Sequence, residues 1–399
     1  MVSNACVCPY CYHTISQERP AFRCTGRGDG IKKPCQPGPD EARDLALGLQ
    51  DNHVLPSFVL TDGVRPVKGQ ARCPKCNDKT GVRVCPTCHT PLPSGLSESA
   101  SPLIGMVGAK QTGKTVFMTV LLHQLQNGIA RRYDAAVDIV GDMPDGRSAA
   151  TAWTIDLERP LFSDRRMVEQ TRQGNGRQPP YVVQWRQSRR ILFFDRTKTM
   201  AMSFYDQSGE DLTRQDSVNA HHYLSAASGL MVLLDPLQLP MVRDVVAVPE
   251  RAMIAGGEPP ISVLSRVTEL LRSSHGVPSK KKVRIPVAVV FSKVDALFSI
   301  LGDNHPIRQV NGSDSVRDDG ASVHEHVRGL LHQWGADNVD AHLRLNYSTF
   351  RYFAVSALGA PPEGDSLAPG DVRPLRVEEP LLWLMQTLRL LKTAKTTVA

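Results

Sequence analysis

The order of apolar and polar positions divides the chain into two parts. From residue 103 onward, short apolar runs alternate with segments whose apolar residues recur every three to four positions. This is the pattern of buried strands followed by amphipathic helices. The first 95 residues lack such periods and are rich in Cys, Pro and Gly. Residues 96–102 have the composition of a linker. We therefore expect a Cys-rich module over 1–95, a linker over 96–102 and a larger domain over 103–399.

The larger domain is predicted to be an α/β fold. Apolar runs predict strands at 103–107, 181–185, 200–205, 229–234, 287–291 and 353–355. Helical periodicity is found at 115–127, 261–273, 323–333 and 380–391. Strands alternating with helices in this order favour a doubly wound, mostly parallel sheet with flanking helices. Two stretches, 135–180 and 236–260, fit neither pattern, and we expect them to carry inserted loops.

A phosphate-binding loop is predicted where the first strand meets the first helix. It fits the pattern G-x-x-x-x-G-K-[ST] and comprises Gly108, Ala109, Lys110, Gln111, Thr112, Gly113, Lys114 and Thr115. In this pattern the backbone N–H groups turn inward around a phosphate, the lysine neutralises phosphate oxygens and the last hydroxyl ligates Mg²⁺. The strand before the loop and the helix after it are the context that the pattern requires.

A second element follows the strand at 200–205. Asp206 and Gly209 match D-x-x-G, in which the acid holds Mg²⁺ through water and the glycine N–H meets the γ-phosphate. Taken alone, this short pattern is also met in ordinary acidic turns after strands. In its nucleotide-binding interpretation, it makes the loop sensitive to the presence of the γ-phosphate.

Two further elements concern the base. Ser292, Lys293 and Asp295 follow the strand at 287–291 and are similar to the N-K-x-D element of GTPases. The carboxylate of Asp295 can accept two hydrogen bonds from guanine, whereas adenine has neither donor. The last element comprises Ser356, Ala357 and Leu358, similar to the S-A-K loop whose backbone meets the guanine oxygen.

The four elements occur in one order, each after a predicted strand, and together they resemble a Ras-like P-loop GTPase of the TRAFAC clade. The Cys-rich N-terminal part makes the layout similar to the bacterial double-GTPase family. That resemblance implies binding of GTP, GDP and Mg²⁺, slow hydrolysis and protein partners encoded nearby. The sequence departs from the pattern in two places. Ser292 stands where Asn is usual, which weakens guanine selection, and Glu210 stands where a Gln orients water, which favours slow or partner-assisted turnover. Thr171 is our candidate for the first switch threonine.

The nine cysteines all lie within the first 88 residues, a clustering that favours metal over core packing. Two C-P-x-C knuckles, Cys73 with Cys76 and Cys85 with Cys88, are expected to hold one structural Zn²⁺. Cys8, Cys11, Cys24 and Cys35 are expected to hold a second. A pairing of Cys8 and Cys11 with a later knuckle remains open, with Cys6 spare and His13 and His89 as alternative ligands.

The remaining composition sets limits on location and partners. No apolar run reaches the roughly 18 residues of a membrane span, and the N-terminus does not resemble a secretory signal, so a cytoplasmic location is expected. The net charge of +7 leaves nucleic acid as a less favoured partner than protein. Two other functions stay open: a zinc-dependent adaptor whose nucleotide domain is nearly inactive, and an ATPase.

Overall fold

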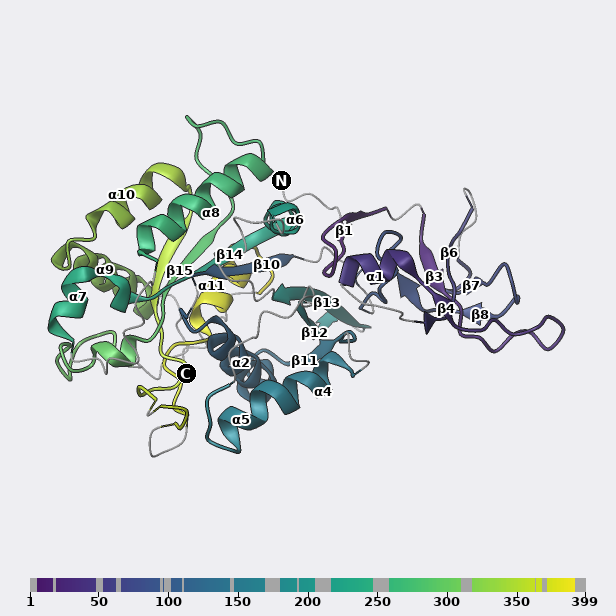
Figure 1. The fold of residues 1–399 in the computed structure, drawn as a ribbon, viewed down its shortest axis with the longest axis horizontal. Coiled ribbons are helices and arrows are strands. Elements are labelled where there is room, and N and C mark those ends of the chain that lie inside the picture. Colours follow the sequence, from purple (N-terminus) through teal and green to yellow (C-terminus); the bar gives the residue numbers. More distant parts are fainter. Residues whose placement is uncertain are drawn as a thin grey trace. The chain divides into compact units, whose positions relative to one another are not determined.

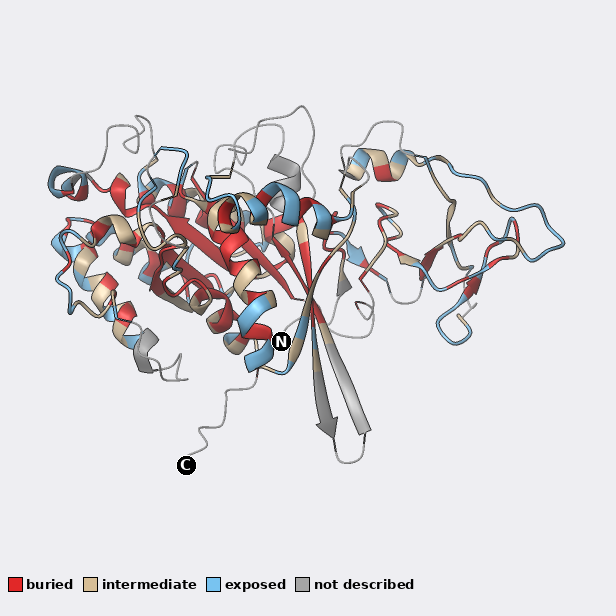
Figure 2. Cartoon of the chain, turned by 90° about the horizontal axis from the view of Figure 1, so that it is seen from below, coloured by how far each residue is buried: buried red, intermediate tan, exposed pale blue. Residues whose placement is uncertain are grey.

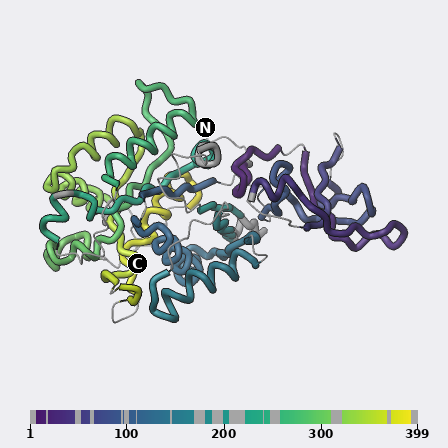
Figure 3. The backbone as a smooth tube through the Cα atoms, in the orientation of Figure 1, coloured from purple at the N-terminus to yellow at the C-terminus, as the bar shows by residue number. Residues whose placement is uncertain are grey.

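A computed structural model describes the protein over residues 6–16, 19–47, 53–61, 66–93, 96, 102–109, 111–143, 147–168, 180–191, 194–204, 217–246, 258–309, 318–362, 364–367 and 372–391. The chain forms two compact units, and Figure 3 traces the backbone through them. Unit 1 consists of Met1–Leu103, Ala130–Ala152 and Thr171–Phe204. Unit 2 consists of Ile104–Ile129, Trp153–Gln170 and Tyr205–Ala399. The Cys-rich segment thus shares its unit with two segments from later in the chain.

The Cys-rich part of unit 1 is built from very short antiparallel strands and one helix, α1 (Glu41–Leu47) (Figure 1). The strands are β1 (Cys6–Val7), β2 (Thr14–Ile15), β3 (Ala21–Arg23), β4 (Gly38–Pro39), β5 (His53–Val54), β6 (Ser57–Val59), β7 (Ala71–Arg72), β8 (Lys79–Thr80) and β9 (Arg83–Val84). They pair as β1-β2, β6-β3-β9, β4-β5 and β7-β8. Strands of this length bury too little apolar surface to be stable alone, so other cross-links must hold this part together.

The other part of unit 1 is an antiparallel sheet in the order β11-β12-β13. Its strands are β11 (Ala135–Val140), β12 (Tyr181–Ile191) and β13 (Phe194–Phe204). The last two pair along their full length, from Tyr181 opposite Phe204 to Ile191 opposite Phe194. The sequence located both strands but placed them in the parallel sheet, and that placement was wrong. No helix separates them, so the chain returns directly and they pair as a hairpin.

Unit 2 is built around a sheet in the order β10-β14-β15-β16. The strands are β10 (Leu103–Gly108), β14 (Ala227–Leu234), β15 (Val287–Phe291) and β16 (Phe350–Ala354). The last three run parallel. Almost every residue of these strands is buried, and Figure 2 shows the sheet in red between its helices. Parallel strands covered on both faces are expected to be continuously apolar, and the α/β fold with a parallel sheet is confirmed.

Helices accompany this sheet. They are α2 (Lys114–Gln124), α6 (Ser217–Ala226), α7 (Pro240–Val245), α8 (Pro260–Ser274), α9 (Asp318–Gln333), α10 (Asp337–Asn346) and α11 (Glu379–Thr387). Shorter pieces of unit 2 are α5 (Arg159–Phe162), η1 (Leu125–Ile129), η2 (Thr154–Glu158), η4 (Pro236–Gln238) and η5 (Val294–Leu297). Two more short helices, α3 (Ala130–Arg132) and all but the last residue of α4 (Ala149–Trp153), lie in unit 1. The four predicted helices correspond to α2, α8, α9 and α11. The sequence missed α6 and α10, and it expected inserted loops in the stretch that contains α7.

Packing explains why the long helices form. Leu264, Val267 and Leu271 lie on one buried face of α8 at helical spacing. α8 packs against α6, α10 and β14, while α9 packs against β16 and α11 against β14 and β15. Within the described residues, no helix combines the length and the apolar character needed to span a bilayer.

Candidate functional site: a phosphate loop and two cysteine clusters

The predicted phosphate loop lies at the end of β10, where the chain turns into α2. A Cβ atom on Gly108 would stand 2.7 Å from the carbonyl oxygen of Leu233, so only glycine fits at this position. Gly113 directly precedes α2 with a φ of 80°, a left-handed conformation that glycine adopts without strain. Each glycine of the pattern therefore has a structural reason: close packing against Leu233 for Gly108 and a left-handed turn for Gly113. The loop delivers the chain to a helix N-terminus, where backbone N–H groups attract anions.

Lys114 begins α2, and its side chain folds back into the loop. Its Nζ atom donates to the carbonyl oxygens of Gly108 at 3.2 Å and Ala109 at 2.7 Å. The Thr112 hydroxyl donates to the same Ala109 carbonyl at 3.0 Å. Lys114 is buried, so its ammonium lies inside the loop rather than in solvent. Thr115 follows in the first turn of α2. A buried cation within a turn that ends at a helix N-terminus can bind a phosphate group.

Lys293 connects the loop after β15 to two other parts of the same sheet edge. Its Nζ atom lies 2.7 Å from Oδ2 of Asp235, which directly follows β14. Its Cε atom would lie 3.9 Å from a Cβ atom on Gly113, so its aliphatic stem passes over the start of α2. Parallel strands bring their carboxyl ends to one edge. The ion pair joins the loops that follow β14 and β15, and the Lys293 side chain lies beside Gly113 at the end of the phosphate loop.

Asp235 is a site residue that the sequence analysis missed. Its side chain is almost fully buried and accepts the backbone N–H of Leu237 at 2.9 Å, which caps η4. A buried carboxylate requires a partner of this kind, and Lys293 supplies the second one. The available signal was an acid directly after an apolar run, the same feature that drew attention to Asp206.

Asp295 and Ser356 meet across two loops. The Ser356 side chain hydrogen-bonds the Asp295 carboxylate. Burial raises the pKa of this carboxyl above its usual value, although Ser356 and Lys293 act in the opposite direction. The Ser356 loop is fixed in turn, because its backbone exchanges hydrogen bonds of 3.1 and 2.8 Å with Leu375. The structure therefore brings together the two elements that the sequence assigned to the base.

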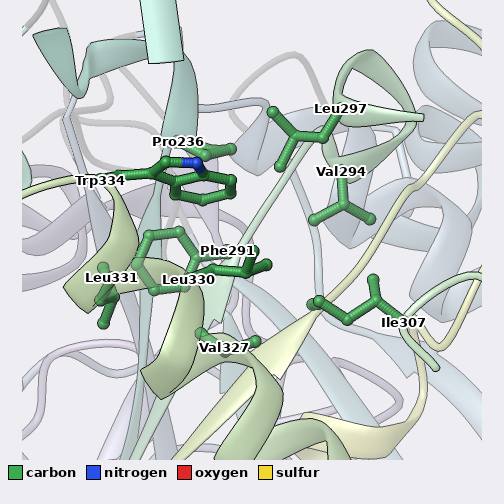
Figure 4. A pocket seen from close by; sticks show the side chains of 10 residues that line it. Pro236, Phe291, Val294, Leu297, Ile307, Val327, Leu330, Leu331 and Trp334 are labelled. Carbon is green, nitrogen blue, oxygen red and sulfur yellow. The ribbon is translucent and has the colours of Figure 1, made fainter. Parts of the chain in front are cut away.

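The loop that carries Lys293 and Asp295 rests on an apolar cluster (Figure 4). The side chains that line it include Pro236, Phe291, Val294, Leu297, Leu331 and Trp334. The space between them is only about 10 Å³, which is too small for a ligand. The cluster supports the loop from the side of α9 and does not itself form a binding site.

The other residues predicted for the nucleotide site fall into two groups, those that the structure describes and those that it does not. Ala357 and Leu358 lie half-buried after Ser356, and Gln111 occupies the phosphate loop with a φ of 62°. Ser292 is buried, and its hydroxyl donates to the Leu234 carbonyl at 3.2 Å. The remaining predicted residues lie outside the described part of the chain. They are Lys110, Thr171, Asp206, Gly209 and Glu210.

The eight predicted cysteine ligands form two clusters, but the preferred pairing was wrong. Cys8 and Cys11 lie with Cys85 and Cys88, and we call this the first cluster. The second cluster contains Cys24, Cys35, Cys73 and Cys76. The two adjacent knuckles therefore serve different clusters, as in the pairing that the sequence left open. Strand β9 lies between the two knuckles in the sequence and pairs with β3. The two knuckles therefore lie before and after a strand of a sheet, and they do not close together as one hairpin.

The geometry of both clusters suits a tetrahedral ion. In the first cluster Sγ atoms lie 3.7 Å apart for Cys8–Cys88 and for Cys11–Cys85. In the second, the distances are 3.4 Å for Cys24–Cys76 and 3.9 Å for Cys35–Cys73. Four sulfurs about 2.3 Å from a central zinc would stand about 3.8 Å from one another. The clusters could hold Zn²⁺.

Three knuckles share one backbone conformation. In each, the first cysteine carbonyl accepts the N–H four residues later, as from Tyr12, Asn77 and His89. The same three residues have positive φ values of 64°, 62° and 51°. This closes a tight turn around the two sulfurs of each knuckle. His13 and His89 belong to neither cluster of candidate ligands among the described residues. The His13 ring bonds the Cys11 carbonyl, and the His89 ring bonds Asp40. The side chain of Cys6 is outside the described residues.

The first cluster packs on the antiparallel sheet of unit 1. Its cysteines share an apolar core with Ile15, Val182 and Ala201. The Ser203 hydroxyl in β13 donates to the Pro9 carbonyl at 2.8 Å. A Cβ atom on Gly141 would stand 2.7 Å from the Tyr10 hydroxyl. The Cys8–Cys11 knuckle is therefore seated on this sheet by an apolar contact, a hydrogen bond and a position that excludes any side chain.

The second cluster is surrounded mainly by polar contacts. Asp78 accepts the Thr25 hydroxyl and, at 3.1 Å, the backbone N–H of Arg27. The Asp78 N–H donates to the Cys76 sulfur and lowers the pKa of that thiol to about 7. The apolar neighbours of this cluster are limited to Leu55 and Phe58 among the described residues. Its loops depend on hydrogen bonds and on the shared cysteines.

Comparisons with known proteins find one curated relative. No protein-family model matches the chain. The chain is 28% identical over 330 residues to SaeC of Mycolicibacterium smegmatis, a proposed ESX-1 scaffolding and assembly protein. That alignment covers 76% of this chain and 79% of SaeC.

Solved structures give distant similarities. They include the GTPase-like domain of S. cerevisiae Ski7 bound to GTP, with 11% identity and a TM-score of 0.31, over 75% of this chain and 52% of that one. The signal recognition particle receptor SRb-GTP/SRX complex of Chaetomium thermophilum has 14% identity and a TM-score of 0.29, over 67% and 95%. A variant of SsGBP has 14% identity and a TM-score of 0.27, over 73% of this chain and 58% of that one. The chain thus spans less than two thirds of the first and third, and no conclusion on function rests on these scores.

Proposed function

We propose that this protein is a GTP-binding switch that hydrolyses GTP slowly and acts on a protein partner. The observation that carries the proposal is the convergence at one sheet edge of the phosphate loop, the Lys293–Asp235 ion pair and the Asp295–Ser356 contact. A loop for phosphates beside a carboxylate for a base is the arrangement that a nucleotide needs. Lys114 would neutralise phosphate oxygens, and the stem of Lys293 would lie along the base.

Guanine selection would depend on Asp295. The ionised carboxylate can accept from N1–H and the exocyclic amine of guanine. The Ser356 hydroxyl would orient that carboxylate, and the backbone of Ala357 and Leu358 would meet the guanine oxygen. Ser292 donates its hydroxyl to Leu234, so it contributes to the fold of the loop and offers less to the phosphate loop than Asn would.

Magnesium and hydrolysis would depend on residues around the γ-phosphate. Thr115 and Asp206 would hold Mg²⁺, Gly209 would meet the γ-phosphate, and Thr171 would close the first switch. Mg²⁺ would neutralise charge on the phosphates. Glu210 would place a second negative charge near the attacking water, so we expect low intrinsic turnover.

The Cys-rich segment would report the nucleotide state. β13 ends at Phe204, two residues before Asp206, and its Ala201 and Ser203 contact the first cluster. A change in the conformation of residues 206–210 on hydrolysis would therefore be transmitted to β13, the strand that contacts the first cluster. The name of SaeC refers to scaffolding and assembly, and we propose that this chain likewise serves the assembly of a protein complex, in the cytoplasm.

Nucleotide selectivity tests this proposal. We expect the purified protein with Mg²⁺ to bind a fluorescent GTP analogue at least tenfold more tightly than the ATP analogue, and Lys114→Ala to lose both. The Asp295→Asn variant should lose GTP binding and gain binding of xanthosine triphosphate, because the Asn amide donates a hydrogen bond where xanthine has a carbonyl. Asp303→Asn is the matched control, since Asp303 is exposed and pairs only with Arg308 among the described residues. Equal affinities for GTP and ATP would instead favour the ATPase.

Acidity offers a second test of Asp295. Its folded-state pKa is raised by burial, so the ionised form costs stability at neutral pH. Asp295→Asn should therefore raise the thermal midpoint of the nucleotide-free protein while abolishing GTP binding. GTP affinity of the unaltered protein should fall on acidification, as the carboxylate takes up a proton. A lower midpoint for Asp295→Asn would show that the carboxylate supports the loop and not the base.

A second candidate is an adaptor that binds nucleotide and barely turns it over. The Ser292 hydrogen bond within the fold and Glu210 favour it. Single-turnover hydrolysis separates the two functions. A rate no faster than the uncatalysed reaction would favour the adaptor, whereas hydrolysis faster than product release would favour the switch.

A further inference from the structure

The second cysteine cluster carries a strongly basic exposed surface. Six exposed cations lie between or beside its ligands: Arg27, Lys32, Lys33, Arg72, Lys75 and Lys79. The four sulfurs lie within 4.8 Å of one another, so the short segments that carry these cations surround one small volume. Arg72 and Lys79 are also directly opposite each other in the β7-β8 pair. Like charges in such a pair are unfavourable, so stability of the fold does not account for them.

Hydrogen bonds within the loop engage the anions of this region. Asp29 accepts the backbone N–H of Ile31 at 3.0 Å and of Lys32 at 2.8 Å, and Asn77 donates to its other oxygen at 2.7 Å. These bonds lower the pKa of Asp29 to about 2. Asp78 is buried against Thr25. The acidic groups are therefore used to build the loop, while the cations remain on its outside.

The same turn presents an apolar side chain. Ile31 is 92% exposed, between the Asp29 turn and Lys32. Val67, in the turn before β7, is 75% exposed and precedes Lys68. In Figure 2 this part of the chain is mostly pale blue, the colour of exposed residues. The surface thus combines cations with large exposed aliphatic groups.

Neutralising the metal cluster does not explain these cations. Zinc with four thiolates carries a net charge of about −2, and this holds for both clusters. The segments that build the first cluster, 6–16 and 84–93, contain no Lys, Arg, Asp or Glu. Charged groups do contact the first cluster from other segments, since Arg23 donates to the His89 carbonyl and Asp40 bonds the His89 ring. The segments that supply its ligands carry none, so a cluster of four thiolates does not by itself require six cations in its own loops.

We propose that this surface, which we call the ribbon tip, binds an acidic protein segment that carries apolar side chains. Phosphates of a nucleic acid would match the cations but leave Ile31 without a partner. Aromatic platforms for bases are also missing from the described part of the ribbon tip, because Phe22 is buried and stacks on Phe58 at 6.2 Å. Charge complementarity together with Ile31 favours an acidic, apolar peptide. The inference deepens the proposed function, resting on it for the expectation of a protein partner.

An array of synthetic peptides tests the ribbon tip. The full-length protein would be applied to 15-residue peptides that vary in Asp/Glu and in Leu/Ile/Val content, and hits would be measured by fluorescence anisotropy. We expect binding to require both residue classes. Lys32→Glu with Lys33→Glu should weaken it at least tenfold, and Ile31→Ser about threefold without changing the salt dependence. Lys280→Glu with Lys281→Glu, exposed lysines of unit 2, is the matched control and should have no effect.

Three results would overturn the inference: no acidic peptide bound above the neutral ones, equal loss in the control variant, or duplex or single-stranded nucleic acid bound more tightly and unaffected by Ile31→Ser. GTP-analogue binding is measured on every variant. Failure of the ribbon tip with intact GTP binding leaves the nucleotide proposal standing, and the reverse result leaves the ribbon tip standing.

Discussion

The two cysteine clusters have the same ligands and nearly the same geometry, yet their surroundings are opposite. The first is sunk in an apolar core with Ile15, Val182 and Ala201, and charged residues are absent from its knuckles. The second has a partly exposed ligand, Cys35, few apolar neighbours and a rim of cations. Identical coordination chemistry therefore supports two tasks. One cluster joins the N-terminal segment to a sheet, and the other shapes a surface loop.

The largest expected contrast comes from removing each cluster in turn. Cys85→Ser with Cys88→Ser should lower the free energy of unfolding of unit 1 by about 4 kcal/mol or more, because metal and core are lost together. Cys73→Ser with Cys76→Ser should lower the global free energy of unfolding by less than about 1 kcal/mol and should unfold only the loops around the second cluster. Metal content should fall from two ions to one in each. Hydrogen exchange at Val182 and Met202 would report the difference, and equal exchange in both variants would remove the distinction.

A smaller contrast uses glycine. Gly141 has a φ of 109° and no room beside Tyr10, so Gly141→Ala should destabilise the protein by about 2 to 3 kcal/mol. Gly81 lies next to β8 of the second cluster, where an added Cβ would meet Gln70 at an ordinary 3.9 Å. Gly81→Ala should stay within about 0.5 kcal/mol. Chemical denaturation of both variants measures this. A neutral Gly141→Ala would mean that Tyr10 is not seated as described.

The hydrogen bond beneath the first cluster should have a moderate effect. Ser203→Ala removes the donor to the buried Pro9 carbonyl. The expected cost is about 1 kcal/mol, since a buried acceptor loses its partner while the surrounding core remains. Both metal ions should be retained. Loss of the first ion in this variant would show that the sheet is needed to assemble the cluster, a stronger link than we infer.

The smallest effect is expected at the tip of the second cluster. Asp29→Ala removes the acceptor of the Ile31 and Lys32 N–H groups. These two amides should exchange faster with solvent, while the thermal midpoint and the metal content stay unchanged. Peptide binding by the ribbon tip should weaken, because the turn that presents Ile31 is no longer fixed. Unchanged exchange at both amides would contradict the role given to Asp29.

Local patterns predicted much of the site. The phosphate loop could be predicted from eight consecutive residues, because the left-handed turn at Gly113 and the start of α2 lie within that stretch. The contact that requires glycine at position 108 comes from the distant Leu233 and could not be predicted. The contact of Asp295 with Ser356 was predictable in outline, since both follow strands of one parallel sheet. Asp235 was not found, because its role depends on Lys293, which lies 58 positions further along the chain.

The sequence by itself determined that each C-P-x-C knuckle forms, that the strands of unit 2 are buried and that the loop at 108–115 opens a helix. Each of these follows from interactions within a few residues. Only the tertiary structure decided which knuckles meet, that β12 and β13 turn back as a hairpin, and which cluster becomes core and which becomes surface. Those outcomes depend on pairings between distant segments, such as β3 with β9, whose free energy is not encoded in either segment alone.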